Sequence, residues 1–378
     1  MARRAAFALL LASLLVVGCG DGPDRPRADP VITRAAAWLW SQQGEDGGWH
    51  SDTYGLLRSG QSLTPFVLDA LLALPEHVAP RPEGGVARAV AFLETHTDVD
   101  GALGLADPDL ADYPCYATAS AVQVLGRLDD ERHDAWRRRM GRWLLGQQLG
   151  DANGWTPSDD AYGAWGMGGV KRTPPNAGHI DLSMTRYVLE ALAPMSPKRP
   201  EVRAARRAGR HFLERVRVRG EDPTTTLGFY FTPVLPEKNK AGPREGGGYE
   251  PYGTTTADGI LALLALGVGL EEPKVTTAVD GLAAAHRVDR TPGPATLVES
   301  GWADATVFYY RAASAQVFAR AGVKQAPAGR DWRADLVAAL AAAQKRDGHF
   351  ANDANRMKED DPLISTAFAL RALTAARR

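Results

Sequence analysis

The sequence predicts an all-α fold in which six helical hairpins close into a ring, with six inner helices surrounded by six outer ones. Three features predict it: a helical stretch rich in small residues recurs six times, a glycine-rich turn follows each copy, and a second, more apolar helix follows each turn. Short connections make neighbouring helices antiparallel, so each unit is a helical hairpin. Internal repetition of this kind decides the architecture before any single motif does.

The first helix of each unit contains a leucine followed four residues later by a polar residue, and it carries Arg and Glu on a face that we expect to be exposed. The turn after it ends on a large apolar side chain. The leucine–polar pairs are Leu39/Gln43, Leu93/Thr97, Leu144/Gln148, Leu213/Arg217, Leu282/His286 and Leu340/Gln344. The turn residues are Trp49, Leu103, Trp155, Tyr230, Trp302 and Phe350.

The second helix of each unit is apolar nearly all round, which predicts that it is buried. Aligned copies begin at Thr64, Thr118, Thr185, Thr256, Arg311 and Thr366, with spacings of 54, 67, 71, 55 and 55 residues. Threonine suits a helix N-terminus because its hydroxyl accepts a backbone N–H. An open solenoid needs polar terminal repeats, but the first and last units here are as apolar as the middle ones. We therefore expect a closed ring, formed as one domain by residues 31–378.

The first residues are typical of a secretory signal. Arg3 and Arg4 precede an apolar run, residues 5–17, that is too short to span a bilayer as a helix. Cys19 follows, and this arrangement resembles a bacterial lipobox. The resemblance implies a signal peptide over residues 1–18, a lipidated Cys19, a flexible tether over residues 19–30, and a lipoprotein of the cell envelope that faces the periplasm or the outer membrane. The alternative is a plain signal peptide with an incidental cysteine.

Charge and cysteine content narrow the possible partners. Without Arg3 and Arg4, 42 of the 44 basic residues remain against 45 acidic ones, a net charge near −3. This balance predicts no nucleic-acid partner, and contact with a membrane only through the lipid anchor. Cys115 is the only cysteine besides Cys19. Its thiol is therefore expected to be buried, reactive or paired with another chain.

Two turns carry a family resemblance. Gln43-Gly47-Trp49 and Gln344-Gly348-Phe350 have the spacing Q-x-x-x-G-x-W/F, which resembles the prenyltransferase/squalene oxidase repeat of squalene cyclases and protein prenyltransferase β subunits. The resemblance implies an α/α toroid over roughly residues 31–377. The third unit has a distorted form, Gln148, Gly154 and Trp155, and the other units keep only the glycine or the large side chain.

The chemistry of those families is not matched by this sequence. The resemblance to terpenoid cyclases would imply an acid of the D-x-D-D type before a Thr-Ala pair, but the residues before Thr118, Thr256 and Thr366 are not acidic. The resemblance to protein prenyltransferases would imply zinc held by Asp, Cys and His, for which Asp112, Cys115 and His179 are the candidates. Their spacing differs from the D-x-C of that family, and Ser365 stands where a histidine is expected. We therefore predict no metal or cofactor, and a buried structural thiol at Cys115.

The inner helices all begin at one end of the predicted ring, where two long insertions, residues 156–180 and 231–253, also emerge. Six helix N-termini meeting there would favour an anion. Asp181 and Arg311 interrupt the pattern of the inner helices; each either pairs locally or contributes to a polar binding site. The candidate ligand-binding residues are Tyr116, Tyr162, Trp165, Tyr252, Tyr309, Tyr310 and Arg311.

Three functions remain open. The first is a binding protein whose central cavity takes a hydrophobic or isoprenoid-like ligand without cyclase activity. The second is an enzyme, similar to a terpenoid cyclase or transferase or acting on a glycan, that uses Asp181 and a loop residue such as His179 as acid and base. The third is a scaffold that binds another protein. A cavity lined by aromatic side chains would distinguish the first two from the third.

Overall fold

The protein is described by a computed structural model over residues 27–107 and 109–377. The predicted signal peptide, Cys19 and the tether up to residue 26 lie outside the described residues. The outer helices are α1 (Ala28–Ser41), α3 (Gly85–His96), α5 (Asp134–Gly146), α7 (Pro200–Val216), α9 (Pro273–Ala284) and α13 (Trp332–Ala343). The inner helices are α2 (Leu63–Leu72), α4 (Pro114–Leu128), α6 (Leu182–Leu192), α8 (Gly253–Ala265), α12 (Val307–Ala321) and α14 (Pro362–Arg377). Residues 28–30, expected to belong to the tether, form the first turn of α1 instead.

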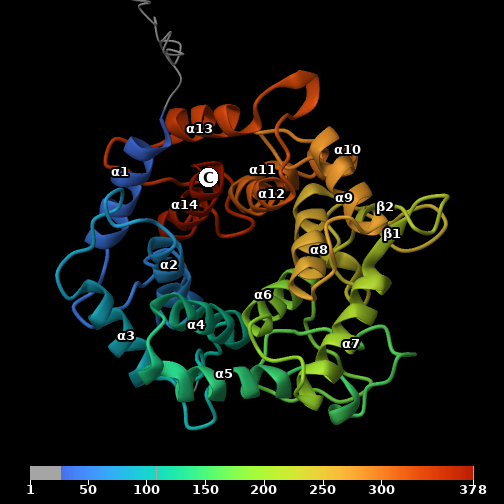
Figure 1. Cartoon of the computed structure of the whole chain (residues 1–378), viewed down its shortest axis with the longest axis horizontal. Helices are drawn as coiled ribbons and strands as arrows, with labels where there is room; N and C mark the ends of the chain where they lie inside the picture. Colours follow the sequence, from blue (N-terminus) through green and yellow to red (C-terminus); the bar gives the residue numbers. More distant parts are fainter. Residues whose placement is uncertain (1–26, 108, 378) are drawn as a thin grey trace, which may run out of the picture.

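The inner helices form a closed ring inside the outer ones (Figure 1). In chain order α2, α4, α6, α8, α12 and α14 each pack against the next, and α14 packs against α2. Each of α2, α4, α6 and α8 also contacts the outer helix that follows it, and α14 contacts α1 in the same way. One hydrophobic cluster extends around the whole ring, from Val31 to Ala376. The predicted all-α ring of six hairpins is confirmed. Within the described residues, no helix combines the length and the apolar character needed to cross a membrane.

In three of the six units the glutamine of the turn joins the hairpin to the next one. The side-chain amide of Gln43 donates to the carbonyl oxygens of Gly47 and of Gly85 at the start of α3, both at 2.9 Å. Gly47 has φ +89°, and a Cβ there would lie 2.4 Å from a carbonyl oxygen of α3. Gln344 in the last hairpin donates in the same way to Val31 in α1, at 2.9 Å. The same kind of contact therefore links hairpin one to hairpin two and links the last hairpin to the first, which closes the ring.

The repeated threonines do not cap their own helices. In five units the threonine hydroxyl accepts the backbone N–H of the large turn residue, so the polar N–H is satisfied where the turn is buried. The donor–acceptor pairs are Trp49–Thr64 (2.9 Å), Leu103–Thr118 (2.9 Å), Trp165–Thr185 (3.1 Å), Phe229–Thr256 (3.4 Å) and Phe350–Thr366 (2.9 Å). The threonine is thus a connection between the turn and the inner helix.

The predicted turn residue of the third unit is Trp155, but the structure places Trp165 there. The side-chain amide of Gln148 donates at 3.0 Å to Gly163, fifteen residues later, so an inserted loop separates the glutamine from its glycine. The Trp165 indole donates to the carbonyl of Leu144 at 2.7 Å, as the Trp49 indole does to Leu39 at 2.6 Å. In the fourth unit Phe229 takes the place predicted for Tyr230, and in the fifth Trp302 begins the short helix α11 (Trp302–Ala305), which follows α10 (Ala295–Glu299).

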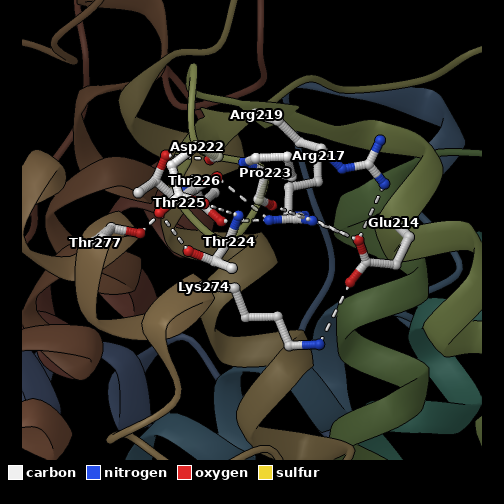
Figure 2. Close-up of polar contacts among 10 residues, drawn as sticks. All are labelled: Glu214, Arg217, Arg219, Asp222, Pro223, Thr224, Thr225, Thr226, Lys274 and Thr277. Carbon is white, nitrogen blue, oxygen red and sulfur yellow. Dashed lines mark hydrogen bonds and ion pairs between the residues drawn. The ribbon is translucent and has the colours of Figure 1, made fainter.

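A small β-hairpin extends from the outside of the ring between α7 and α9 (Figure 1). Its strands are β1 (Arg217–Arg219) and β2 (Thr226–Phe229), paired antiparallel. Figure 2 shows how polar contacts fix it to both helices. The Arg217 guanidinium donates to the Glu214 carboxylate of α7 at 2.9 Å and to the hydroxyl of Thr226 at 3.2 Å. Glu214 also pairs with Arg219 at 3.3 Å and with Lys274 of α9 at 3.4 Å, so one carboxylate links the hairpin to two outer helices.

Candidate ligand-binding cavity

A cavity of about 210 Å³ lies between the inner helices, near the end of the ring at which these helices begin. Five of the six inner helices contribute side chains from their first two turns, and the loops before α2, α4, α12 and α14 complete the wall. The lining residues are Leu57, Ser62, Leu63, Phe66, Tyr113, Tyr116, Ser120, Tyr187, Thr306, Tyr309, Met357, Lys358, Glu359, Ile364 and Phe368.

Apart from Leu63, the lining residues of the inner helices follow a simple rule of position. They lie two residues before or two residues after the repeated threonine (or the arginine that replaces it in the fifth unit), as Tyr116 and Ser120 do around Thr118. Residues four apart lie on the same face of a helix, and the threonine between them faces the turn instead. The six pairs given by this rule are Ser62/Phe66, Tyr116/Ser120, Ser183/Tyr187, Thr254/Asp258, Tyr309/Ala313 and Ile364/Phe368. This spacing was the signal from which Phe66, Tyr187 and Phe368 could have been found.

Six of the fifteen residues that line the cavity are aromatic. In one group the ring centroids of Phe66 and Phe368 are 5.0 Å apart, and those of Phe368 and Tyr309 are 5.2 Å apart. In the other, Tyr116 lies 6.2 Å from Tyr113 and 5.2 Å from Tyr187. All four contacts are edge-to-face, the arrangement that aromatic pairs prefer. The cavity is therefore an apolar site with a preformed wall.

A buried polar cluster supports the wall at Tyr309. The Tyr309 hydroxyl donates to the Asp258 carboxylate at 2.8 Å and 2.9 Å, and Ser183 donates to the same group at 2.6 Å. The Arg186 guanidinium lies 3.8 Å from Asp258 and 2.9 Å from Glu190, with its carbon 4.4 Å from the centroid of Tyr187. Burial disfavours the charged form of Asp258 and raises its pKa to about 6. Asp258 is the one acidic residue at the twelve positions given by the threonine rule.

A second buried carboxylate, Glu359, caps an inner helix. Its oxygens accept the backbone N–H groups of Phe308 and Tyr309 at the start of α12, at 2.9 Å and 2.8 Å, and the side chain of Asn352 at 3.0 Å. Only 1% of Glu359 is exposed. Burial raises the pKa of this carboxyl to about 7, although its hydrogen bonds favour the charged form.

We expect the Glu359→Gln substitution to change how stability depends on pH. The folded-state pKa is raised, so Glu359 contributes stability below the unfolded pKa and loses it as pH rises toward 7. At about 1.4 kcal/mol per pKa unit, the wild type should lose about 2 to 3 kcal/mol of unfolding free energy relative to the variant between pH 5 and pH 8. Urea unfolding of both proteins at the two pH values measures this difference.

Wild type and Glu359→Gln contain the same other titratable groups, so the contributions of those groups to the pH dependence of stability cancel in the difference between the two proteins. His286 acts in the opposite direction, because burial lowers its pKa to about 4 and its stabilising contribution is lost as pH falls below 6.5. Glu237→Gln, at an exposed position, serves as the control and should leave the pH dependence unchanged. Equal pH profiles for wild type and Glu359→Gln would contradict the prediction.

The structure distributes the predicted ligand-binding residues over several places. Tyr116 and Tyr309 line the cavity. The other five do not, and each has a different environment. Tyr162 donates to Asp151 in the inserted loop, and Trp165 is the buried turn residue of the third unit. Tyr252 borders a separate groove between β2 and α9. The Tyr310 hydroxyl lies 2.7 Å from Nδ1 of His286, and Arg311 donates to the Val288 carbonyl at 2.9 Å.

The catalytic and metal candidates are engaged in local contacts. Asp181 accepts the N–H of Met184 at 2.7 Å as the N-cap of α6, and it lies 3.0 Å from the ring of His179. Asp112 is buried and accepts hydrogen bonds from Ser59 and Ser62, while Cys115 is buried with its pKa raised by desolvation. Asp112, Cys115 and His179 do not converge. No group of three or more His, Cys, Asp or Glu side chains in the described residues is placed to hold a metal ion.

Four of the six inner-helix N-termini do not offer the anion-binding groups that we expected. Carboxylates of the chain itself already accept their backbone N–H groups: Asp112 at α2, Asp181 at α6, Glu359 at α12 and Asp361 at α14. An N-terminal helix dipole that meets a carboxylate is neutralised locally. These four N-termini therefore give little preference for an anionic ligand.

Comparison with known proteins supports the fold. No protein-family model matches this chain, and a search of curated proteins found no relative. Solved structures do match. A variant of the type II terpene cyclase MstE from Scytonema, in complex with its substrate geranylgeranyl dihydroxybenzoate, has a TM-score of 0.55 and 15% identity over 93% of this chain and 97% of that one.

Two further structures share the ring. A protein from Actinoplanes has a TM-score of 0.54 and 14% identity, covering 93% of this chain and 100% of that one. The GH76A α-1,6-mannanase from Salegentibacter sp. HEL1_6 has a TM-score of 0.53 and 11% identity, covering 93% and 98%. The chain is thus an α/α toroid, similar in structure to terpene cyclases and to GH76 mannanases.

Proposed function

We propose that the protein binds a small hydrophobic or amphipathic molecule in the cavity between its inner helices. The observation that carries the proposal is the aromatic wall: six rings from five inner helices and an adjoining loop surround one space. Ligand sites are typically concave and apolar with a few placed polar groups. The similarity to MstE supports a ligand of this class, since that protein holds an isoprenoid substrate in the same fold.

Polar side chains at the cavity are already hydrogen-bonded within the protein, and this favours a hydrophobic ligand over a glycan. A sugar needs many hydrogen-bonding partners, but three polar lining residues are already bonded within the protein: Glu359 to backbone N–H groups, Ser62 to Asp112 and Tyr309 to Asp258. The volume of the cavity indicates the size of the ligand. About 210 Å³ is somewhat more than the ~150 Å³ of an apolar cavity that holds one benzene ring. This suits a short chain or a single small ring rather than a C20 isoprenoid.

Catalysis is a second candidate function, and it is supported by Asp258 rather than by Asp181. Asp258 is bonded to the hydroxyl of a cavity-lining tyrosine, and its pKa of about 6 suits proton exchange near neutral pH. We further propose that a lipid on Cys19 tethers the toroid in the cell envelope, on the basis of the signal-like residues that precede it.

We expect neutral probes to bind and a cavity-filling variant to lose them. 1-Octanol and geraniol should raise the thermal unfolding temperature of the purified protein and be retained in native mass spectra. Ser120→Phe places a benzyl group in the cavity and should abolish both effects, whereas Ser196→Phe, at an exposed position, should not. Absence of binding to wild type would refute the proposal. Undiminished binding to a folded Ser120→Phe protein would place the ligand elsewhere.

A further inference from the structure

Two charged side chains line the cavity, and the protein holds them differently. Glu359 is buried and its carboxylate is occupied by backbone N–H groups of α12 and by Asn352. Lys358 is half-exposed, and its ammonium lies 5.5 Å from the ring centroid of Tyr54 and 5.6 Å from that of Tyr113. In the described part of the chain no carboxylate lies within 4.0 Å of this ammonium. Glu359 is thus hydrogen-bonded within the protein, whereas the half-exposed Lys358 has no carboxylate in contact with its ammonium.

The contacts of the neighbouring residues fix the backbone conformation at Lys358. Lys358 has φ +60° and Tyr113 has φ +45°, and these are two of the three non-glycine residues with positive φ in the described residues. Such conformations persist only where the surrounding structure enforces them, and they are concentrated at functional sites. The residues after Lys358 supply that constraint: Glu359 caps α12, Asp360 accepts the Tyr54 hydroxyl at 2.5 Å, and Asp361 caps α14.

We propose that the ligand of this cavity is a single-chain amphiphile whose carboxylate head pairs with Lys358 while its apolar body contacts Phe66, Tyr116 and Phe368. This inference rests on the proposed function and names the chemical class of the ligand. A cationic head group would be repelled by the Lys358 ammonium. A neutral head group would form no ion pair with this half-exposed ammonium, so it should bind less tightly than a carboxylate. A cavity volume of about 210 Å³ suits a body of one short chain.

Three probes of equal chain length test the head group: octanoate, 1-octanol and octylammonium. By isothermal titration calorimetry at pH 7.5 we expect octanoate to bind about tenfold more tightly than 1-octanol, as a charge-assisted contact provides, and octylammonium to bind least. Lys358→Met should reduce octanoate to the affinity of 1-octanol, and Lys358→Arg should keep the preference. Lys345→Met removes an exposed lysine and should change nothing.

The outcomes separate this inference from the proposed function. Equal binding of octanoate and 1-octanol to wild type, tighter binding of octylammonium, or a preference for octanoate that survives Lys358→Met would each overturn the inference and leave the hydrophobic site standing. Failure of all three probes to bind would instead refute the proposed function. The comparison among probes needs only the wild type, so it holds even if Lys358→Met does not fold.

Discussion

Replacing Gly163 by alanine should lower the free energy of unfolding by about 2 to 5 kcal/mol, the sum of a left-handed backbone penalty and of overpacking. Gly163 has φ +88°, and a Cβ there would lie 1.8 Å from the carbonyl oxygen of Ala208 in α7. That atom belongs to the main chain of an outer helix, so the helix or the turn must move. The Gln148 contact that joins the third and fourth hairpins would be lost with it.

Gly246 provides a matched control, because it has φ +84° but no other heavy atom within 4 Å of the position that a Cβ would take. Gly246→Ala should cost only the left-handed penalty of about 1 to 2 kcal/mol. Urea unfolding of the two variants separates conformational strain from close approach. Equal losses for both would show that α7 does not approach the turn at Gly163.

Replacing Arg186 by methionine should cost about 3 to 5 kcal/mol at pH 8, the range for removing one partner of a buried charge pair. Only 2% of Arg186 is exposed, and its loss leaves Asp258 without a cationic partner and Glu190 without its closest one. The loss should be smaller at pH 5, where Asp258 takes up a proton because its pKa is raised to about 6. Chemical unfolding at both pH values measures the two losses.

Arg320 is the control for this substitution. Its guanidinium lies 3.5 Å from the other oxygen of Glu190, but 47% of its side chain is exposed. Exposed pairs contribute at most about 1 kcal/mol, so Arg320→Met should have little effect. Adding Asp258→Asn to Arg186→Met should recover part of the stability, since the uncompensated carboxylate is then removed. Equal costs for the two arginines would refute the buried-charge explanation.

Part of the candidate site could have been predicted from the chain alone. The threonine register identifies the cavity-facing positions of the inner helices, and Phe66, Tyr187 and Phe368 follow from it. Of the seven side chains proposed as ligand-binding, Tyr116 and Tyr309 occupy such positions. The prediction of the other five as ligand-binding residues rests on their chemical type or on their place in an insertion. Insertions are not constrained by helix periodicity, so the direction of their side chains cannot be inferred from spacing.

The sequence by itself determined the repeat and its closure, because helix periodicity and the apolar character of both terminal hairpins are local properties that need no knowledge of distant residues. Only the tertiary structure decided which glycine and tryptophan complete the third turn, since the loop from 149 to 162 breaks the spacing while Gly163 still meets α7. It alone decided that Asp112 and Glu359, carboxylates from neighbouring loops, cap α2 and α12, and that no carboxylate in the described residues lies within 4.0 Å of the Lys358 ammonium. Such pairings join residues far apart in the chain, and their geometry arises only when the ring closes.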